Sequence, residues 1–221
     1  MFLSNYDSVK LDEIVLQYNQ IRMFKGRIMT KRRFGIDIDG TITRPDTILP
    51  YINKDFKTEL KLEDITEYNI RKFVDVDEQT MYQWFRSNEA DIYKQSPIKD
   101  DSQRILNAWA EHFADLYFIS ARNASLMDIT TEWFNHHELT YNHIELIGSH
   151  DKIEAIKRHN IDIFFEDKDD NAIQIHEECN IPVILFNTPY NQSYVPNDVI
   201  RVNNWQEADN WVRAWLQNRN A

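Results

Sequence analysis

The stretch "RRFGIDIDGTIT", residues 32–43, places Asp37 and Asp39 two positions apart at the end of an apolar run that is typical of a buried strand. On a strand, residues i and i+2 point to the same face, so these two carboxylates are expected to be neighbours. Like charges that close repel unless a cation lies between them. An Asp-Gly pair after alternating residues also fits a hairpin turn, with both aspartates on the wet face of an edge strand. The rest of the chain must decide between the two interpretations.

Length and composition point to a globular protein with a sizeable core. The chain has 221 residues, of which 42% are hydrophobic and 13% aromatic, enough for one large domain or for one domain that carries a smaller one. The formal net charge of -11 argues against a nucleic-acid polymer as partner, because such proteins usually present a basic face. It leaves room for a small phosphorylated ligand held by a few cations or by a metal.

Several classes of site are excluded by residue counts. The single cysteine, Cys179, can form no internal disulfide and no cysteine-cluster metal site, and we expect it to be a partly buried side chain at a helix end. The chain has only four glycines, which cannot spell a G-x-G-x-x-G fingerprint or a Walker loop: Gly26, Gly35, Gly40 and Gly148. Any phosphate site must therefore use side chains, a metal and isolated backbone amides.

The N-terminal stretch does not resemble a targeting segment. It carries acidic residues early and lacks a basic flank before an apolar run, as a signal peptide would need. No apolar run approaches the roughly 20 residues that span a bilayer. We therefore expect a soluble, cytoplasmic protein without a membrane partner.

From residue 30 onward, apolar strand-like runs alternate with helical stretches. One such stretch, 101–114, carries Ile105, Leu106, Trp109 and Phe113 at helical spacing. Near-continuous apolar strands separated by helices are typical of a parallel sheet covered on both faces. The predicted fold class is thus α/β, a doubly wound parallel sheet. The predicted strands are 34–39, 116–121, 144–148, 161–167 and 181–187.

Residues 44–100 break this alternation. They read as short amphipathic helices without a buried strand, and Pro45, Pro50 and Pro97 lie near the edges, as in connections. We predict a small helical cap over 44–100, an α/β core made of 30–43 and 101–221, and an N-terminal helical extension over 1–29.

Polar residues follow the predicted strands at the edge where ligands bind in open parallel sheets. The first strand ends in Asp37 and Asp39, and the second in Ser120, Ala121 and Arg122. The fourth ends in an acidic group, and Lys152 opens the helix before it. The members of the acidic group are Glu166, Asp167, Asp169 and Asp170.

These residue types can perform phosphoryl transfer together. Several carboxylates with few basic partners call for a hard divalent cation, and oxygen ligands suit Mg²⁺. One aspartate can attack phosphorus, and a second can protonate the leaving oxygen and then deprotonate water. A hydroxyl and an ammonium, Ser120 and Lys152, can bind the phosphoryl oxygens.

Each residue alone has a simpler explanation. Ser120 could be a helix cap or a loop hydroxyl, and Lys152 a solvated lysine in a first helical turn. The acidic run "EDKDDN" could be a helix-start cluster favoured by the macrodipole. Their joint placement on one rim, in a workable order, favours the catalytic interpretation.

The motifs "DIDGT" (37–41), "ISAR" (119–122), Lys152 and "EDKDDNA" (166–172) resemble those of the haloacid dehalogenase-like phosphohydrolases. The resemblance implies that Asp37 is the nucleophile and Asp39 the general acid/base. It implies that Mg²⁺ is held by Asp37, by the backbone carbonyl of Asp39 and by Asp167, with Asp170 and Glu166 as supporting acids. Because the dehalogenases of this superfamily lack the second aspartate, Asp39 points to phosphate-ester cleavage.

Further residues receive weaker assignments. Arg122 could touch the phosphate or the cap, or form a surface salt bridge, and Thr41 and Thr43 could reach the phosphate from the turn after the nucleophile. The helical insertion looks like the cap that closes over substrate. Its aromatic residues are candidates to stack on a base, although packing inside the cap explains each of them as well: Tyr68, Trp84, Phe85 and Tyr93.

Within the superfamily the chain is most similar to bacterial nucleotidases related to 5'(3')-deoxyribonucleotidases, on "GIDIDGTIT", "EDITEYNI", "FFEDKDDNA" and "NTPYNQ". The tail predicts a last strand at 198–202 and a closing helix with Trp211 and Trp215. The expected substrate is a small phosphate ester, in the first place a nucleoside monophosphate. A sugar phosphate or another small metabolite is the alternative, and a phospho-accepting receiver or an inactive metal-binding domain belongs to a different class. The order of motifs and the cap-sized insertion speak against a receiver.

Overall fold

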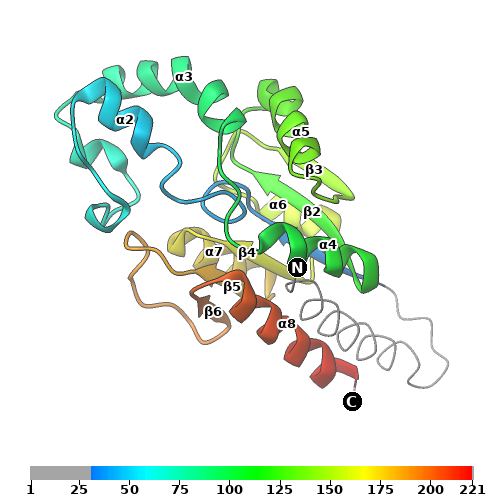
Figure 1. Ribbon diagram of the computed structural model, residues 1–221. Helices are drawn as coiled ribbons and strands as arrows, with labels where there is room; N and C mark the ends of the chain where they lie inside the picture. The colour runs from blue at the N-terminus through cyan, green and yellow to red at the C-terminus, as the bar shows by residue number, and fades with distance from the viewer. Residues whose placement is uncertain (1–30, 221) are drawn as a thin grey trace, which may run out of the picture.

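The computed structural model describes residues 31–220, and the predicted extension over 1–29 lies outside them. Its centre is a six-stranded sheet in the order β3-β2-β1-β4-β5-β6, and every paired strand runs parallel to its neighbour (Figure 1). The strands are β1 Arg32–Ile36, β2 Ala114–Ser120, β3 His143–Leu146, β4 Ile163–Glu166, β5 Val183–Phe186 and β6 Val199–Val202. The predicted doubly wound α/β fold is confirmed, and the predicted strands differ from these by a few residues at their ends.

The strand order reverses next to β1, which lies in the middle of the sheet. β2 and β3 extend to one side of β1, and β4, β5 and β6 extend to the other. In open α/β sheets, ligands bind beyond the carboxyl ends of the strands at such a reversal. Asp37 and Asp39 follow β1 directly, so the fold itself brings them to this position.

Helices cover both faces of the sheet. On one face, α4 (Ser102–His112), α5 (Met127–His136) and α8 (Trp205–Asn220) bury an aromatic core with Phe34, Trp109 and Trp205. On the other face, α6 (Ile153–His159) and α7 (Asp169–Cys179) pack on Phe164, Val183 and neighbouring side chains. Burial of these apolar side chains is the main term that stabilises the sheet between its helices.

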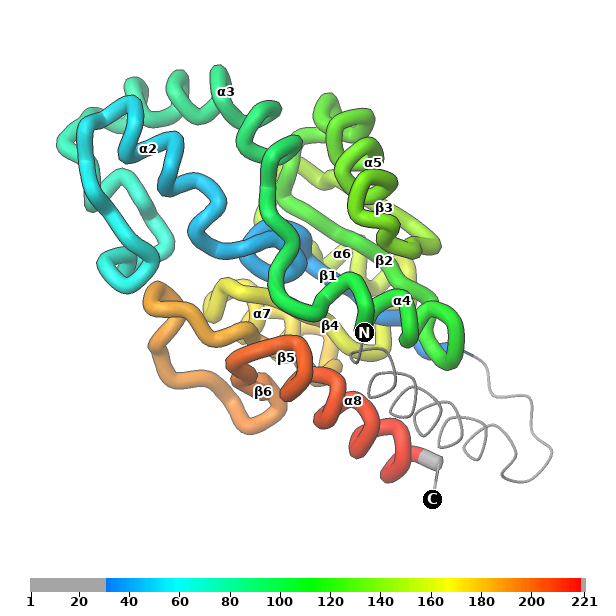
Figure 2. Tube along the Cα trace, in the orientation of Figure 1, coloured from blue at the N-terminus to red at the C-terminus, as the bar shows by residue number. Residues whose placement is uncertain are grey.

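Residues 44–100, here called the cap segment, form α2 (Leu49–Phe56), the 3₁₀ turns η1 (Leu62–Asp64) and η2 (Ile70–Phe73), and α3 (Glu78–Lys94). They surround a small apolar cluster of their own with Ile52, Val74 and Met81 at its centre. The tube in Figure 2 shows this segment standing beyond one end of the sheet. Its two connections to the core lie side by side, because Arg44 N donates to Pro97 O (3.0 Å) and Lys99 N donates to Ile42 O (2.8 Å).

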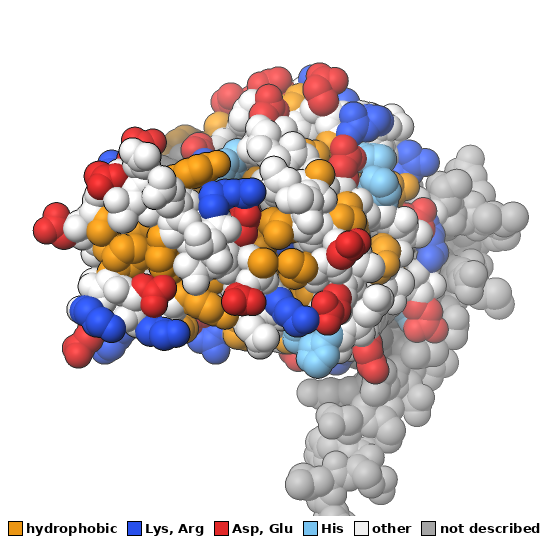
Figure 3. All heavy atoms as spheres, turned by 90° about the horizontal axis from the view of Figure 1, so that it is seen from above, with side chains coloured by type: hydrophobic (Ala, Val, Ile, Leu, Met, Phe, Trp, Pro, Cys, Tyr) orange, Lys and Arg blue, Asp and Glu red, His pale blue; other side chains and the backbone are white. Residues whose placement is uncertain are grey.

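The surface shows mixed charge. On the face drawn in Figure 3, Lys and Arg side chains of the described residues lie among Asp and Glu side chains rather than in one broad patch. Within residues 31–220, no helix has both the length and the apolar character that crossing a bilayer requires.

Candidate active site

A cavity of about 410 Å³ opens between the carboxyl ends of the strands and the cap segment. The core contributes charged side chains to its wall and the cap contributes mainly apolar and aromatic ones. Among the core side chains that line it are Asp37, Asp39, Ser120, Arg122, Lys152, Glu166 and Asp167. These residues come from four separate segments, and the parallel sheet brings them together because each follows or precedes the carboxyl end of a strand.

Lys152 links two buried carboxylates at the bottom of the cavity. Its ammonium donates to Asp37 Oδ1 (2.5 Å) and to Glu166 Oε2 (2.7 Å), and its own side chain is almost wholly buried. Asp37, Glu166 and Asp167 place carboxylate oxygens within 4.8 Å of one another. Lys152 and the buried Lys99, whose charge acts on Asp167, thus stand against three buried acids, so the group is short of positive charge.

The pKa values of Asp37 and Asp167 reflect this shortage of positive charge. Burial, with the charges of Glu166 and Asp39, raises the pKa of Asp37 to about 7 against the opposing charge of Lys152. Burial and the charges of Glu166 and Asp37 raise the pKa of Asp167 well above its usual range. A cation bound among these oxygens would favour their charged forms.

The donor set fits magnesium. Asp37, Glu166 and Asp167 offer only carboxylate oxygens, and Mg²⁺ takes oxygen ligands while keeping several of its waters. Buried carboxylates without a full complement of cations are the environment in which such an ion compensates charge.

Asp39 is held by Arg122. Arg122 donates from Nε to Oδ2 of Asp39 (2.9 Å) and from Nη2 to Oδ1 (2.7 Å), a bidentate contact that fixes the carboxylate plane. The guanidinium also donates to Thr130 Oγ1 (3.1 Å) and lies 3.9 Å from the ring centre of Tyr93 on α3. Burial acts to lower the pKa of Arg122, but Asp39 raises it, and the guanidinium stays charged. Asp39 therefore faces the cavity from a fixed position.

The predicted hydroxyl residues differ in their positions. Ser120 lines the cavity, and its Oγ accepts a hydrogen bond from the backbone N–H of Arg122 (3.2 Å). Thr41 is fully buried and does not belong to the cavity wall, whereas Thr43 does, with its Oγ1 accepting from the N–H of Gly40 (3.1 Å). Of the two threonines, Thr43 is therefore the one on the cavity wall.

Asp170 lies away from the three clustered acids. It is in the first turn of α7, where its Oδ1 accepts from the N–H of Asn171 and its Oδ2 pairs with Lys168 at 2.9 Å. About two thirds of its side chain is exposed. For Asp170 and its neighbour Asp169, the helix-start interpretation of the acidic run accounts for the positions.

Two residues from the loop after β5 hold Asp167, and the sequence analysis did not single them out. Tyr190 donates its hydroxyl hydrogen to Asp167 Oδ2 (2.5 Å). Asn191 donates from Nδ2 to the backbone oxygens of Asp167 (2.6 Å) and Phe186 (2.7 Å). Both residues lie in the "NTPYNQ" stretch (187–192), one of those that carry the family resemblance, and this was the available signal. Lys99 was also missed; its buried ammonium donates to Gly40 O (2.9 Å) in the loop that follows β1.

Three of the four aromatic candidates in the cap line the cavity: Tyr68, Phe85 and Tyr93. Trp84 does not, because its ring packs on Phe56 (5.2 Å between centroids) and its Nε1 donates to Asp55 Oδ2 (2.7 Å). Tyr68 reaches across to the core, with its ring 5.8 Å from the rings of both His150 and Tyr190. The cap wall thus offers apolar and aromatic surfaces opposite the charged floor.

Comparison with known proteins identifies a family for the chain. Residues 33–217 match the family described as 5' nucleotidase, deoxy (pyrimidine), cytosolic type C protein (NT5C). The chain is 47% identical over 190 residues to a protein of Halalkalibacterium halodurans named as a putative nucleotidase, covering 86% of this chain and 97% of the relative. It is 47% identical over 180 residues to one of Bacillus subtilis with the same description, covering 81% and 93%.

A solved structure supports the fold. The crystal structure of a predicted phosphatase from Clostridium acetobutylicum superposes with a TM-score of 0.61 at 16% identity, covering 84% of this chain and 99% of that one. With the family match over most of its length, the chain belongs to the NT5C family of nucleotidases, within the haloacid dehalogenase-like phosphohydrolases.

Proposed function

We propose that the protein is a Mg²⁺-dependent phosphomonoesterase that hydrolyses a nucleoside monophosphate through a phosphoryl group carried on Asp37. The observation that carries the proposal is the group of three buried carboxylates, two of them bridged by Lys152, which faces an aromatic cap wall across one cavity. Burying three carboxylates costs free energy that a purely structural cluster would not offset. Such a cluster suits a site where charge is rearranged during a reaction.

In the first step, a carboxylate oxygen of Asp37 attacks the phosphorus atom. A P–O bond to Asp37 forms, the P–O bond to the nucleoside breaks, and the leaving oxygen takes a proton from Asp39. Lys152 contacts Asp37, and Ser120 lines the same cavity; both would donate hydrogen bonds to the phosphoryl oxygens. Arg122 holds Asp39 at its site through two hydrogen bonds, which limits the positions from which Asp39 can deliver the proton.

In the second step, a water molecule attacks the same phosphorus atom. Asp39, now without its proton, accepts one from this water; the P–O bond to Asp37 breaks, and inorganic phosphate leaves. Mg²⁺ held by Asp37 and Asp167, with Glu166 nearby and the backbone carbonyl of Asp39 as an expected ligand, would offset the negative charge on the phosphoryl group.

The cap wall supports a substrate with a flat apolar part. Tyr68, Phe85 and Tyr93 line the cavity together with apolar side chains of the same segment. Aromatic rings hold nucleobases by stacking, worth about 1–3 kcal/mol per base. A sugar phosphate offers no such surface, so the lining favours the nucleotide.

The test is phosphate release from nucleoside 5'- and 3'-monophosphates, deoxy and ribo, beside sugar phosphates, with Mg²⁺ and with EDTA. We expect Mg²⁺-dependent release that falls by at least about a thousandfold in Asp37→Asn. Asp170→Asn is the matched control, because it removes a nearby carboxylate outside the cluster, and it should retain activity close to that of the wild type. Persistent turnover in Asp37→Asn would contradict the assignment of the nucleophile.

The phosphorylated form can be sought directly. Asp39→Asn lacks the group that activates water, so rapid quenching of its reaction with p-nitrophenyl phosphate, whose leaving group needs no proton from Asp39, should trap a hydroxylamine-sensitive phosphoryl group on the protein. The double variant Asp37→Asn/Asp39→Asn should trap none. A trapped phosphoryl group of equal amount in the double variant would exclude Asp37 as its carrier.

A further inference from the structure

We propose that His143, Glu145 and His159 form a second metal site, separate from the active site, for a first-row transition-metal cation that prefers imidazole ligands, with Zn²⁺ as the leading candidate. Among residues 31–220, two groups of three side chains bring metal-ligating atoms within 4.8 Å of one another. One is the all-carboxylate group of the active site, and the other is this one.

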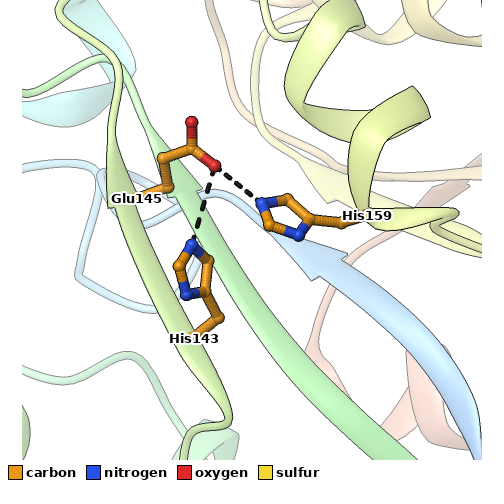
Figure 4. Close-up of side chains that lie close together, drawn as sticks. All are labelled: His143, Glu145 and His159. Carbon is orange, nitrogen blue, oxygen red and sulfur yellow. Dashed lines mark hydrogen bonds and ion pairs between the residues drawn. The ribbon is translucent and has the colours of Figure 1, made fainter.

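The fold positions all three side chains at one edge of the sheet. His143 and Glu145 are two apart on the edge strand β3, so both point to the same face. His159 is the last residue of α6, which packs on that face. Figure 4 shows both imidazole rings directed at the Glu145 carboxylate, one from the strand and one from the helix. The H-x-E side chains of the strand and the histidine of the following helix therefore meet in space.

The distances are close to those that a metal needs. His159 Nε2 lies 2.7 Å from Glu145 Oε2, and His143 Nε2 lies 3.7 Å from the same oxygen. Tetrahedral zinc, with bonds near 2.0–2.1 Å, needs ligand atoms about 3.3 Å apart. Small side-chain rotations would satisfy this geometry without any movement of the backbone.

The chemistry of the donors separates this site from the active site. Two imidazole nitrogens and one carboxylate oxygen suit Zn²⁺ and its neighbours, whereas Mg²⁺ prefers oxygen ligands alone. The side chains are 43%, 24% and 19% exposed for His143, Glu145 and His159. Water can therefore reach the cation and fill its remaining positions.

Neighbouring residues hold the three ligands in place. The Tyr117 ring on β2 lies 6.0 Å from the His143 ring and 5.1 Å from the His159 ring, so it forms a shared floor beneath both imidazoles. The Arg158 guanidinium pairs with Glu145 Oε1, which leaves Oε2 as the oxygen that faces the histidines. Such supporting contacts orient ligands before a metal arrives.

A cation at this position would fasten α6 to the edge of the sheet. α6 starts immediately after Lys152 and ends at His159, seven residues further along the chain. The proposed metal site therefore lies about 10 Å along the helix axis from Lys152, the active-site residue at the other end of α6. The site would act on stability and on the placement of α6 rather than on the chemical step. This proposal does not depend on the proposed reaction.

The test is calorimetric titration of the full, tag-free chain with Zn²⁺ in an excess of Mg²⁺, which keeps the oxygen site occupied. We expect one Zn²⁺ event that weakens by at least about tenfold in His143→Asn, in His159→Asn and in Glu145→Gln. His136→Asn, which replaces an exposed histidine on α5, is the matched control and should bind as the wild type does. The melting temperature of the wild type, but not of the three variants, should rise with Zn²⁺.

His143 is half-exposed, so its replacement should fold, and a circular dichroism spectrum together with unchanged phosphate release would verify this. Zn²⁺ binding of equal affinity in His143→Asn, His159→Asn and the wild type would overturn the proposal, as would the absence of any binding at millimolar Zn²⁺. In either case the three side chains would be ion-paired with one another rather than ligands.

Discussion

The hydroxyl of Tyr190 donates a 2.5 Å hydrogen bond to Oδ2 of Asp167, the acid that we assign to the metal. Tyr190 comes from the loop after β5 and lies 23 residues along the chain from Asp167. The same tyrosine contacts the ring of Tyr68 from the cap segment. A single side chain thus touches both the proposed metal ligand and the wall that would hold the substrate.

Removing that hydroxyl should weaken the metal site. In Tyr190→Phe, Asp167 loses the donor that fixes its orientation, and outer partners of this kind are typically worth about 10–100-fold in metal affinity. We expect the Mg²⁺ concentration for half-maximal phosphate release to rise about tenfold, while activity at saturating Mg²⁺ changes much less. Tyr194→Phe, at an 87% exposed tyrosine of the same loop, is the control. An unchanged Mg²⁺ requirement in Tyr190→Phe would show that Asp167 does not depend on this contact.

Gly40 allows the loop that follows β1 to approach Asp167. Its φ is +80°, and a Cβ there would lie 2.0 Å from Asp167 Oδ2. Gly148 also has a positive φ, +66°, but a Cβ there would meet nothing within 4 Å. Both glycines therefore have a left-handed backbone conformation, but only Gly148 has room for a side chain.

We expect Gly40→Ala to abolish most of the phosphate release, because Asp167 or the loop must move. Gly148→Ala should cost about 1–2 kcal/mol of unfolding free energy from the left-handed backbone alone and keep its activity. Chemical denaturation of both variants would measure the cost of the left-handed backbone. Phosphate release would show the added effect of the contact between a Cβ at position 40 and Asp167. Equal activity in the two variants would argue against close packing of Gly40 on Asp167.

The sheet was predictable because its signals are local. Apolar runs of four to seven residues, bounded by polar stops, predicted the strands that contain Phe34, Phe118, Phe165 and Ile184. The D-x-D pattern indicated that two acids meet at a sheet edge. The structure ends β1 at Ile36, so both aspartates lie just beyond the strand, although Asp37 N still donates to Phe165 O as a continuing ladder would.

The contacts around the acids were not predictable, because they join segments far apart in the chain. Lys99 and Gly40 are 59 residues apart, and nothing in the sequence around either indicates their contact. Composition alone could not tell which acids of the run 166–170 lie in the site and which face solvent. Glu166 ends β4 and is buried, whereas Asp170 falls in the first turn of α7 and faces solvent, and only the point at which the strand gives way to the helix separates them.

The role of the cap aromatic residues in binding a nucleobase can be tested by comparing substrates with and without a base. If Tyr68 stacks on it, Tyr68→Ala should raise the KM for a nucleoside monophosphate about tenfold, since stacking is worth about 1–3 kcal/mol. Ribose 5-phosphate, which has no base, should be affected far less. Tyr82→Ala changes a 63% exposed cap tyrosine outside the cavity wall and is the control. Equal effects on both substrates would assign Tyr68 to packing of the cap on the core.

The ionisation of Asp37 should be visible in stability as well as in activity. Its pKa is about 7 in the folded protein without metal, against 3.8 for an ordinary aspartate, because burial and the charges of Glu166 and Asp39 outweigh Lys152. Between these two values the folded state holds a proton that the unfolded state has released. The free energy of unfolding contributed by Asp37 is therefore fully present below about pH 4 and is lost as the pH rises through about 7.

Asp37→Asn removes this titration, so in EDTA the variant should gain stability relative to the wild type as the pH rises from 4 to 8, by about 1–3 kcal/mol. Denaturant unfolding of both proteins at several pH values measures this difference. Mg²⁺ should then stabilise the wild type at pH 8 more than Asp37→Asn, since a cation among the carboxylates favours the charged form that burial disfavours. A difference that stays flat with pH would mean that Asp37 is already ionised in the folded protein, and that Lys152 alone compensates its charge.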